Sequence, residues 1–155
     1  MAWTWEQSQR FAGRRVIVAG GTDFYPARVG RAIDDDVLDI TGHVRDAVGG
    51  RRGSAVLVYV PHTTAGVTVN EHADPAVARD FEAALERMVD EGWPWEHVEE
   101  GEENAPTHIR AAFMGPSVVI PRRDDGSMAL GTWQGIFFCE FDGPRDRTVH
   151  VTVLR

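Results

Sequence analysis

The spacing of apolar and polar residues predicts a chain dominated by β-strands. Residues 54–60 (SAVLVYV) form a continuous apolar run rich in valine, which is typical of a strand buried on both faces. Residues 65–71 (AGVTVNE) alternate, so a second strand should place its valines on one face and Thr68 and Asn70 on the other. Further strands are expected over residues 14–20, 117–121, 127–130, 132–143 and 148–154.

Other segments have the apolar spacing of helices. The strongest is residues 74–92, in which Asp74 suits the N-cap, Pro75 suits the first turn and Gly92 ends the pattern. Its buried stripe should comprise Val77, Phe81, Ala84, Leu85 and Met88.

Two shorter helices complete the pattern. Residues 40–48 have apolar residues at four-residue spacing with Thr41 as a candidate cap, and residues 106–114 stop at Gly115. Few helices among many strands predict an α+β fold. We expect a single compact domain over residues 1–155, with a mainly antiparallel or mixed sheet.

The composition limits the classes of partner. The net charge is −8 and the arginine pairs are isolated, so binding to nucleic acid is not expected. All 16 basic residues are arginine, so an anion site must use arginine, histidine, backbone N–H groups or a metal. No apolar run has the length of a membrane span, the N-terminus does not resemble a secretory signal, and a single cysteine allows no internal disulfide. We therefore expect a cytoplasmic protein with no membrane partner.

Polar residues crowd the ends of the first two strands. His62, Thr63 and Thr64 follow the first strand with no polar loop between, and Asn70 and Glu71 end the second. A strand that only fills a core does not require them. We expect a shared end of the two strands to gather all five side chains into a site.

Three histidines lie in polar surroundings: His62, His97 and His108. Each alone has an ordinary structural explanation, at a strand end, in a loop and on a helix. Together with a carboxylate such as Glu71 or Glu100 they suit a zinc-like ion. Their spacing matches no metal motif, so such a site depends on the fold bringing them together.

The segment after residue 130 combines glycine with polar and aromatic side chains. Gly131 and Gly135 bracket Thr132, Trp133 and Gln134, and glycine within a strand pattern indicates a bulge or a close approach of another group. The tryptophan and glutamine either belong to the core or line a pocket.

Further along, Arg145 and Arg147 flank Asp146 after a Gly-Pro turn. They are either exposed turn residues or a clamp for an oxyanion. Cys139 has no basic neighbour in an apolar strand, so we interpret it as a packed thiol and not a nucleophile.

Several of these segments together resemble one family. PHTTAGVTVNE with the following Asp74 and Asp80, then HVEEGEENAPTHI, GPSVVIP and LGTWQGIFFCEFDGPR, resemble the YjbQ-like family, also called the secondary thiamine-phosphate synthase family. The resemblance runs in order from about Ile40 to the C-terminus. Residues 1–39 match poorly and are expected to be a variable segment.

The resemblance implies a compact α+β protomer that assembles as a homotrimer. It also implies a weak thiamine-phosphate synthase activity and a polar site where the motifs converge. Carried over by position, with Arg145 added from the turn described above, the site comprises His62, Thr63, Thr64, Asn70, Glu71, His97, Glu100, His108, Thr132, Trp133, Gln134 and Arg145.

Three functions follow as hypotheses. The first is an enzyme that joins a pyrimidine-methyl diphosphate to a thiazole phosphate and releases diphosphate, with a divalent ion, Mg²⁺ or Zn²⁺. The three histidines would contact the metal or the diphosphate, Glu71 or Glu100 would orient a histidine or complete the ion's shell, and Trp133 would stack on the pyrimidine. The alternatives are a metal-dependent hydrolase or lyase acting on another small phosphorylated substrate, and a non-catalytic trimer that binds a phosphorylated metabolite.

Overall fold

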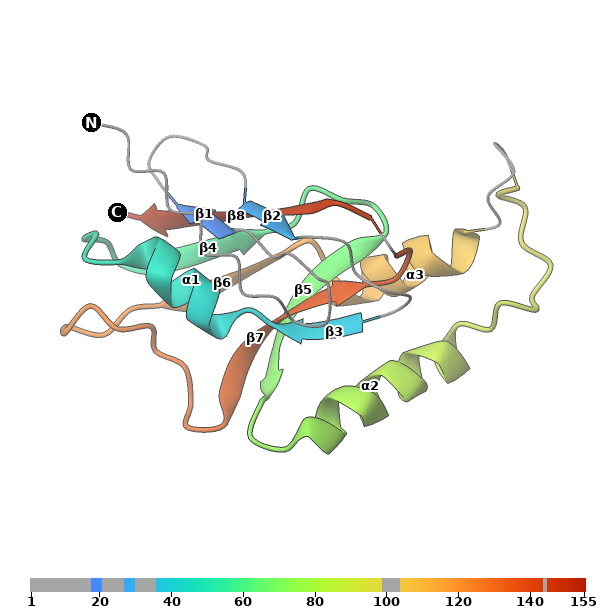
Figure 1. Ribbon diagram of the computed structural model, residues 1–155, viewed down its shortest axis with the longest axis horizontal. Coiled ribbons are helices and arrows are strands. Elements are labelled where there is room, and N and C mark those ends of the chain that lie inside the picture. The colour runs from blue at the N-terminus through green and yellow to red at the C-terminus, as the bar shows by residue number, and fades with distance from the viewer. Residues whose placement is uncertain (1–17, 21–26, 30–35, 99–103, 144) are drawn as a thin grey trace.

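The protein contains two β-sheets that pack face to face. The structure is a computed structural model that describes residues 18–20, 27–29, 36–98, 104–143 and 145–155. Figure 1 shows its elements. The larger sheet has the strand order β1-β8-β4-β6, with β2 also pairing to β8. Its strands are β1 (Val18–Gly20), β2 (Ala27–Val29), β4 (Ala55–Tyr59), β6 (Ser117–Pro121) and β8 (Arg147–Leu154).

The smaller sheet has three antiparallel strands in the order β3-β7-β5. They are β3 (Asp36–Asp39), β7 (Gln134–Glu140) and β5 (Ala65–Glu71). In the larger sheet only the β1–β8 pairing is parallel among the described strands. The predicted α+β fold with a mainly antiparallel sheet is therefore confirmed. The expected strand over residues 127–130 is reduced to an isolated bridge between Arg122 and Met128.

Three helices are described: α1 (Thr41–Val48), α2 (Pro75–Met88) and α3 (Ala105–Met114). The Asp74 side chain caps α2 by accepting a hydrogen bond of 2.8 Å from the Ala76 N–H, as predicted. The predicted cap at Thr41 is wrong, because Thr41 is the first helical residue and its own N–H donates to the Asp39 carboxylate. None of the helices in the described part of the chain is long and apolar enough to cross a membrane.

The main core lies between the two sheets. It combines the inward residues of both sheets with the apolar face of α1, including Val58, Val67 and Phe138, which are fully buried. The prediction that residues 54–60 are buried on both faces is wrong for this chain. Burial alternates along β4, and Tyr59 on the outer face is 40% exposed because within the chain only the inner face is covered.

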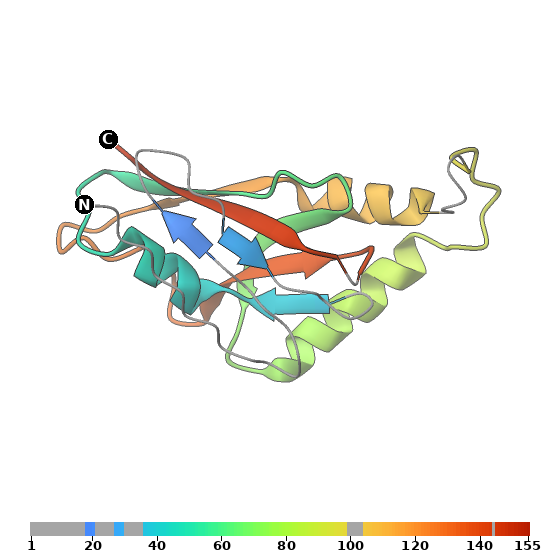
Figure 2. The same cartoon turned by 45° about the horizontal axis from the view of Figure 1, so that its top comes forward.

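A second apolar layer covers the other face of the smaller sheet. Phe137, Cys139 and Phe141 lie against Leu85 of α2 and Ala111 of α3. Figure 2 shows α2 running beside β3. Burial raises the pKa of the Cys139 thiol to about 12, so its interpretation as a packed, unreactive thiol is confirmed.

The predicted stripe of α2 is only partly buried. Leu85 is 5% exposed, but Met88 is 60% exposed and Ala84 also faces solvent. The helix rests on a three-stranded sheet that is narrow, so one line of side chains is covered and the flanks of the stripe are not.

The fold positions the candidate site through β5 and β7, which pair along their whole lengths. The register places Ala65 opposite Glu140 at one end and Glu71 opposite Gln134 at the other. Helix α3 crosses close to the first end, where a Cβ on Gly66 would lie 2.7 Å from the Met114 Cβ. Glycine at this position therefore lets α3 contact the strand directly.

Candidate functional site

The predicted site residues fall into two groups at opposite ends of β5. The prediction that one strand end gathers them is wrong, because six residue steps separate Thr64 from Asn70, or roughly 20 Å along a strand. We call the first group the histidine cluster: His62, Thr63, Thr64, His97 and His108. We call the second the tryptophan cluster: Asn70, Glu71, Thr132, Trp133 and Gln134.

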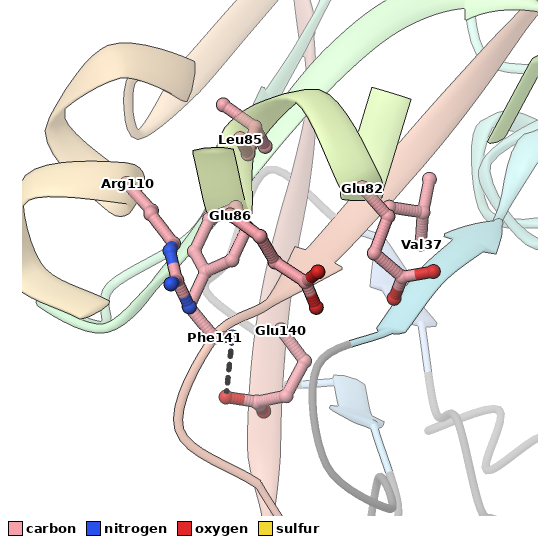
Figure 3. Close-up of a pocket in the computed structure, with 7 residues that line it drawn as sticks. All are labelled: Val37, Glu82, Leu85, Glu86, Arg110, Glu140 and Phe141. Atoms are coloured by element: carbon pink, nitrogen blue, oxygen red, sulfur yellow. Dashed lines mark hydrogen bonds between the residues drawn. The ribbon is translucent and has the colours of Figure 1, made fainter. Parts of the chain in front are cut away.

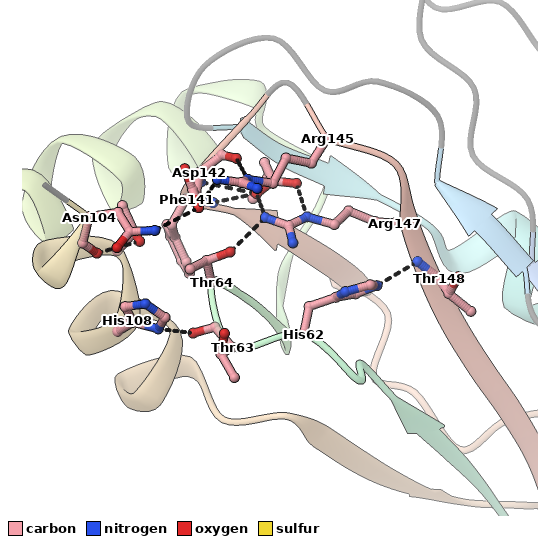
Figure 4. Close-up of polar contacts among 12 residues, drawn as sticks. His62, Thr63, Thr64, Asn104, His108, Phe141, Asp142, Arg145, Arg147 and Thr148 are labelled. Carbon is pink, nitrogen blue, oxygen red and sulfur yellow. Dashed lines mark hydrogen bonds and ion pairs between the residues drawn. The ribbon is translucent and has the colours of Figure 1, made fainter. Parts of the chain in front are cut away.

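In the histidine cluster, His62 has a defined protonation pattern. Its Nε2 accepts a hydrogen bond of 2.7 Å from the backbone N–H of Thr148 on β8, as drawn in Figure 4. Burial lowers the pKa of His62, and the nearby Arg147 guanidinium lowers it further. The neutral ring therefore carries its proton on Nδ1. In this arrangement His62 presents an N–H donor, whereas a metal ligand needs a lone pair.

His108 has the complementary pattern. Its Nδ1 lies 3.1 Å from the Thr63 carbonyl oxygen, which can only accept, so Nδ1 carries a proton and, in the neutral imidazole, Nε2 has the lone pair. The ring of His97 lies edge-to-face with it, at a centroid distance of 5.3 Å. A hydrogen bond from Nδ1 to a carbonyl is the usual way in which a metal-binding imidazole is oriented.

The expected site with three histidine ligands is not assembled in the described residues. No group of three or more His, Cys, Asp or Glu side chains there is close enough to hold an ion. Two imidazoles, those of His97 and His108, are adjacent, while His62 uses its one lone pair on Thr148. Glu100, expected as a further ligand, lies outside the described residues.

A buried ion pair holds the histidine cluster in place. Glu140 is fully buried, and its carboxylate accepts from Arg147 Nε at 2.6 Å and also from Arg147 Nη2. The same Nη2 donates to the Thr64 hydroxyl at 2.7 Å. Sequence analysis missed Glu140, although a carboxylate at the end of an apolar strand was a usable signal. The pair joins β7 and β8 to the residue that precedes β5.

The expected arginine clamp is wrong in part, because Arg147 is used inside this buried pair. Arg145 is 41% exposed and contacts Asp142, with Nη2 3.0 Å from Oδ2 and Nε 3.0 Å from the backbone oxygen. Asp142 also accepts from Asn104 Nδ2 at 3.1 Å. As Figure 4 shows, this carboxylate links the turn before β8 to the start of α3, near His108.

The tryptophan cluster is more open. Trp133 is 64% exposed, so its alternative assignment to the core is wrong, and Thr132 and Gln134 are exposed as well. Gln134 Oε1 accepts from the Gly131 N–H at 2.8 Å, which fixes this turn. Glu71 is half-buried at the end of β5. These residues form a surface beside the strand ends and not an enclosed pocket.

One residue of this end was missed by sequence analysis. His72 follows Glu71, and its Nδ1 lies 2.9 Å from Asp39 Oδ2. A Cβ on Gly135 would lie 2.8 Å from the His72 Cβ and Cγ, so the predicted close approach at Gly135 is confirmed. A histidine next to the strand-end Asn-Glu pair was the signal that could have identified it.

A small pocket lies away from both clusters. Figure 3 shows it between α2, α3 and the smaller sheet, lined by Val37, Glu82, Leu85, Glu86, Arg110, Glu140 and Phe141. Arg110 is 2% exposed and donates to the Val89 carbonyl at 3.1 Å and to Glu91 Oε1 at 3.3 Å. These contacts fasten α3 to the end of α2. None of the predicted site residues lines the pocket, so we assign it to packing.

The fold is a two-sheet α+β domain. Its polar clusters lie at the two ends of the paired strands β5 and β7. A sequence model of the family described as "UPF0047 protein YjbQ-like" matches residues 28–155. The chain belongs to this family. The match begins within the segment 1–39 that resembled the family poorly, and this segment supplies β1, β2 and β3.

Known relatives agree with this assignment. The chain is 43% identical over 126 residues to UPF0047 protein YugU of Bacillus subtilis, covering 77% of this chain and 90% of the relative. A crystal structure of an uncharacterized YjbQ/UPF0047-family protein from Clostridium acetobutylicum is similar, with a TM-score of 0.77, 42% identity and coverage of 84% of this chain and 99% of that one. A YbjQ-like protein of unknown function from Sulfolobus solfataricus has a TM-score of 0.76 at 32% identity, covering 83% and 94%.

Proposed function

We propose that this protein is an enzyme with thiamine-phosphate synthase-like activity, which joins a pyrimidine-methyl diphosphate to a thiazole phosphate. The observation that carries the proposal is the pair of fixed imidazole tautomers in the histidine cluster. His62 presents an N–H donor and His108 presents a lone pair. Both residues are half-buried, and hydrogen bonds made there are stronger than in water. Arg145 adds a positive charge at the same end of the molecule.

The reaction requires stabilisation of the departing diphosphate anion. The bond between the methylene carbon and the diphosphate oxygen breaks, and its electron pair leaves with diphosphate. The thiazole nitrogen then supplies the electron pair of the new carbon–nitrogen bond. The donors that we assign to the diphosphate are His62 Nδ1–H and the Arg145 guanidinium, which would act as oxyanion stabilisers.

A divalent ion remains the proposed cofactor. His97 and His108 would supply imidazole ligands and Glu100, three residues after His97, a carboxylate. This ligand set favours zinc over magnesium, because imidazole suits zinc and magnesium prefers oxygen. When bound, the ion would neutralise charge on a phosphate group.

We further propose that the site is shared between copies of a homotrimer. The two clusters lie roughly 20 Å apart along one chain, and the proposed pyrimidine substrate is much shorter than this. A neighbouring copy can bring its tryptophan cluster to the first copy's histidine cluster. The outer face of the larger sheet supports such a contact, since it leaves Tyr59 40% and Val119 58% exposed.

The activity is tested with purified protein, both substrates and Mg²⁺ or Zn²⁺, measuring thiamine phosphate. His62→Ala should lower kcat/KM by roughly 100-fold, the scale for loss of one anion-stabilising donor. His108→Ala, which removes a proposed metal ligand, should also lower it strongly. His43→Ala, on α1, is the matched control and should keep the full rate. If His62→Ala also keeps the full rate, the site assignment fails.

The shared site is tested by mixing two impaired variants. His108→Ala and Trp133→Ala subunits, co-expressed in equal amounts, should regain about one quarter of the wild-type activity, because one site in four would combine two intact clusters. Mixed oligomers that show no gain over the single variants would contradict a site shared between copies.

A second candidate, a metal-dependent hydrolase or lyase acting on a small phosphorylated substrate, is favoured by the free lone pair of His108 beside His97. Metal analysis of the purified protein separates the two. Tightly held, stoichiometric zinc supports the hydrolase, and an ion needed only together with substrate supports the synthase. Binding of phosphorylated metabolites without any turnover would instead indicate a non-catalytic binding protein.

A further inference from the structure

Asp39 and His72 join the two edge strands of the smaller sheet across its central strand. Asp39 ends β3, His72 directly follows β5, and β7 lies between them. Asp39 Oδ2 and His72 Nδ1 are 2.9 Å apart. They meet because Gly135 of β7 has no side chain, since a Cβ there would lie 3.0 Å or less from three atoms of His72.

This geometry favours the ionised form of Asp39 and a proton on His72 Nδ1. Asp39 Oδ1 accepts from the Thr41 N–H at 2.8 Å and from the Thr41 hydroxyl. Partial burial alone would raise the pKa of Asp39, but the hydrogen bonds from Thr41 and His72 outweigh it and hold that pKa below its usual value. An ionised carboxylate only accepts, so His72 Nδ1 carries a proton, and in the neutral imidazole Nε2 then has a lone pair.

The surroundings indicate which chemistry this lone pair can meet. The backbone N–H of His72 donates to the Trp133 carbonyl at 2.9 Å. Trp133, whose indole is exposed, therefore lies directly opposite His72. Asp39, Glu71 and Asp74 place three carboxylates at this end, against the guanidinium of Arg123 at the Leu130 carbonyl. At the other end Arg145 and Arg147 are each paired with a carboxylate. An acidic end disfavours phosphate and suits a neutral ring that donates a hydrogen bond.

We propose that His72 and Trp133 bind an aminated heteroaromatic ring. His72 Nε2 accepts a hydrogen bond from the exocyclic amine, and the Trp133 indole stacks on the ring. Asp39 is a positioning residue that holds the imidazole tautomer. The identity of the ring as an aminopyrimidine rests on the proposed function, and this placement assigns the ring end of the substrate to the tryptophan cluster and the phosphate end to the histidine cluster.

The test uses a probe without phosphate, 4-amino-5-hydroxymethyl-2-methylpyrimidine, titrated into the full-length protein by calorimetry. Saturable binding is expected. His72→Ala should weaken binding about fivefold, the scale of one neutral hydrogen bond, and Trp133→Ala by at least as much. His43→Ala is the matched control and should bind as the wild type does. No binding to the wild type, or equal binding to His72→Ala, would overturn the proposal.

Two further measurements separate positioning from general structural damage. Long-range ¹H–¹⁵N spectra should show the Nδ1–H tautomer of His72 in the wild type and its loss in Asp39→Ala, whereas Asp39→Asn, which keeps an acceptor oxygen, should retain it. Gly135→Ala should weaken probe binding as His72→Ala does, while Gly42→Ala, where nothing lies within 4 Å of the added Cβ, should not. An unchanged tautomer in Asp39→Ala would contradict the positioning role.

These outcomes are distinguishable from failure of the proposed function. If no thiamine phosphate is formed but probe binding still depends on His72, the ring site stands and the synthase proposal fails. If thiamine phosphate is formed and His72→Ala keeps the KM for the pyrimidine substrate, the synthase proposal stands and the ring site fails.

Discussion

The histidine cluster and the tryptophan cluster lie at opposite ends of the same two strands, but different interactions hold them. The first rests on the Glu140–Arg147 pair, in which both side chains are at least nine-tenths buried. The second rests on the Asp39–His72 pair, in which both side chains are more than one-third exposed. A buried charged network defines one geometry strongly, because any lost partner leaves an unpaired charge without water.

The difference indicates that the two ends have different roles: the histidine cluster is the rigid end and the tryptophan cluster is the adaptable end. Orienting donors toward a diphosphate requires fixed positions, which the buried pair provides. Accepting a ring against an exposed indole requires an open surface, which the half-exposed pair permits. If the two ends differ in this way, substitutions at the histidine cluster should cost more stability than matched substitutions at the tryptophan cluster.

The largest effect is expected from breaking the buried pair. Glu140→Ala should lower the free energy of unfolding by about 3–5 kcal/mol, because it leaves the Arg147 guanidinium buried without its partner. Chemical denaturation followed by circular dichroism measures this. Asp39→Ala, at the half-exposed pair, should cost about 1 kcal/mol or less.

A control at the same end is Arg145→Met, which removes an arginine from a partly exposed ion pair with Asp142. It should also cost about 1 kcal/mol or less. Equal losses in Glu140→Ala and Asp39→Ala would contradict the distinction between a rigid and an adaptable end.

Local features of both ends could be predicted from the sequence, and the predicted strand length also implied that the two ends are separate. Period-two alternation identified β5, and Asp74 and Gly115 marked helix boundaries, because these signals depend on neighbouring residues. The alternation also placed Asn70 correctly at a strand end. The predicted bounds of this strand, residues 65–71, already place His62 before its start and Asn70 near its end, so the expectation of one shared end overlooked the length of the strand.

The contacts that build each end are distant in sequence, which explains why they were missed. Arg147 reaches Thr64 across 83 residues and His72 reaches Asp39 across 33, and neither pair follows from local periodicity. The outer face of β4 shows another limit of prediction from local sequence. A run of apolar residues predicts burial on both faces, but the run does not say whether the second face is covered within the chain or by another copy.

The next largest effect is expected from the two glycines that allow close approach. Gly66→Ala should lower the free energy of unfolding by about 1–3 kcal/mol, because its Cβ would meet the Met114 Cβ at 2.7 Å and the Gly115 carbonyl oxygen at 3.0 Å. Gly135→Ala should cost less, because the His72 Cβ and Cγ that its Cβ would meet at 2.8 Å belong to an exposed residue just beyond the end of β5, where the chain can shift without displacing a helix.

Thermal unfolding of both variants beside Gly42→Ala provides the comparison, since nothing lies within 4 Å of a Cβ on Gly42. A greater loss in Gly135→Ala than in Gly66→Ala would show that the histidine at the tryptophan end is held as rigidly as the helix at the other end.

The smallest expected effect is a difference between the two ends in how their stability depends on pH. His62 and Asp39 both have lowered pKa values, through burial of the imidazole and through hydrogen bonds to the carboxylate. A lowered pKa means that the unfolded chain binds more protons, so stability from each group is complete above its unfolded pKa and is lost as the pH falls. The loss should begin below pH 6.5 for His62 and below pH 3.8 for Asp39.

Denaturant titrations from pH 8 to pH 3 test this with variants that keep a hydrogen-bond acceptor but do not titrate. His62→Gln should flatten the stability profile below pH 6.5 and leave the region below 3.8 unchanged, and Asp39→Asn should do the reverse. As the pH falls, the histidine cluster should therefore lose stability before the tryptophan cluster does, although it is the more buried of the two. Burial of the neutral His62 imidazole opposes its protonation, whereas Asp39 is stabilised in its charged form. If Asp39→Asn alters the profile near neutral pH, the carboxylate is not held in the state that its contacts imply.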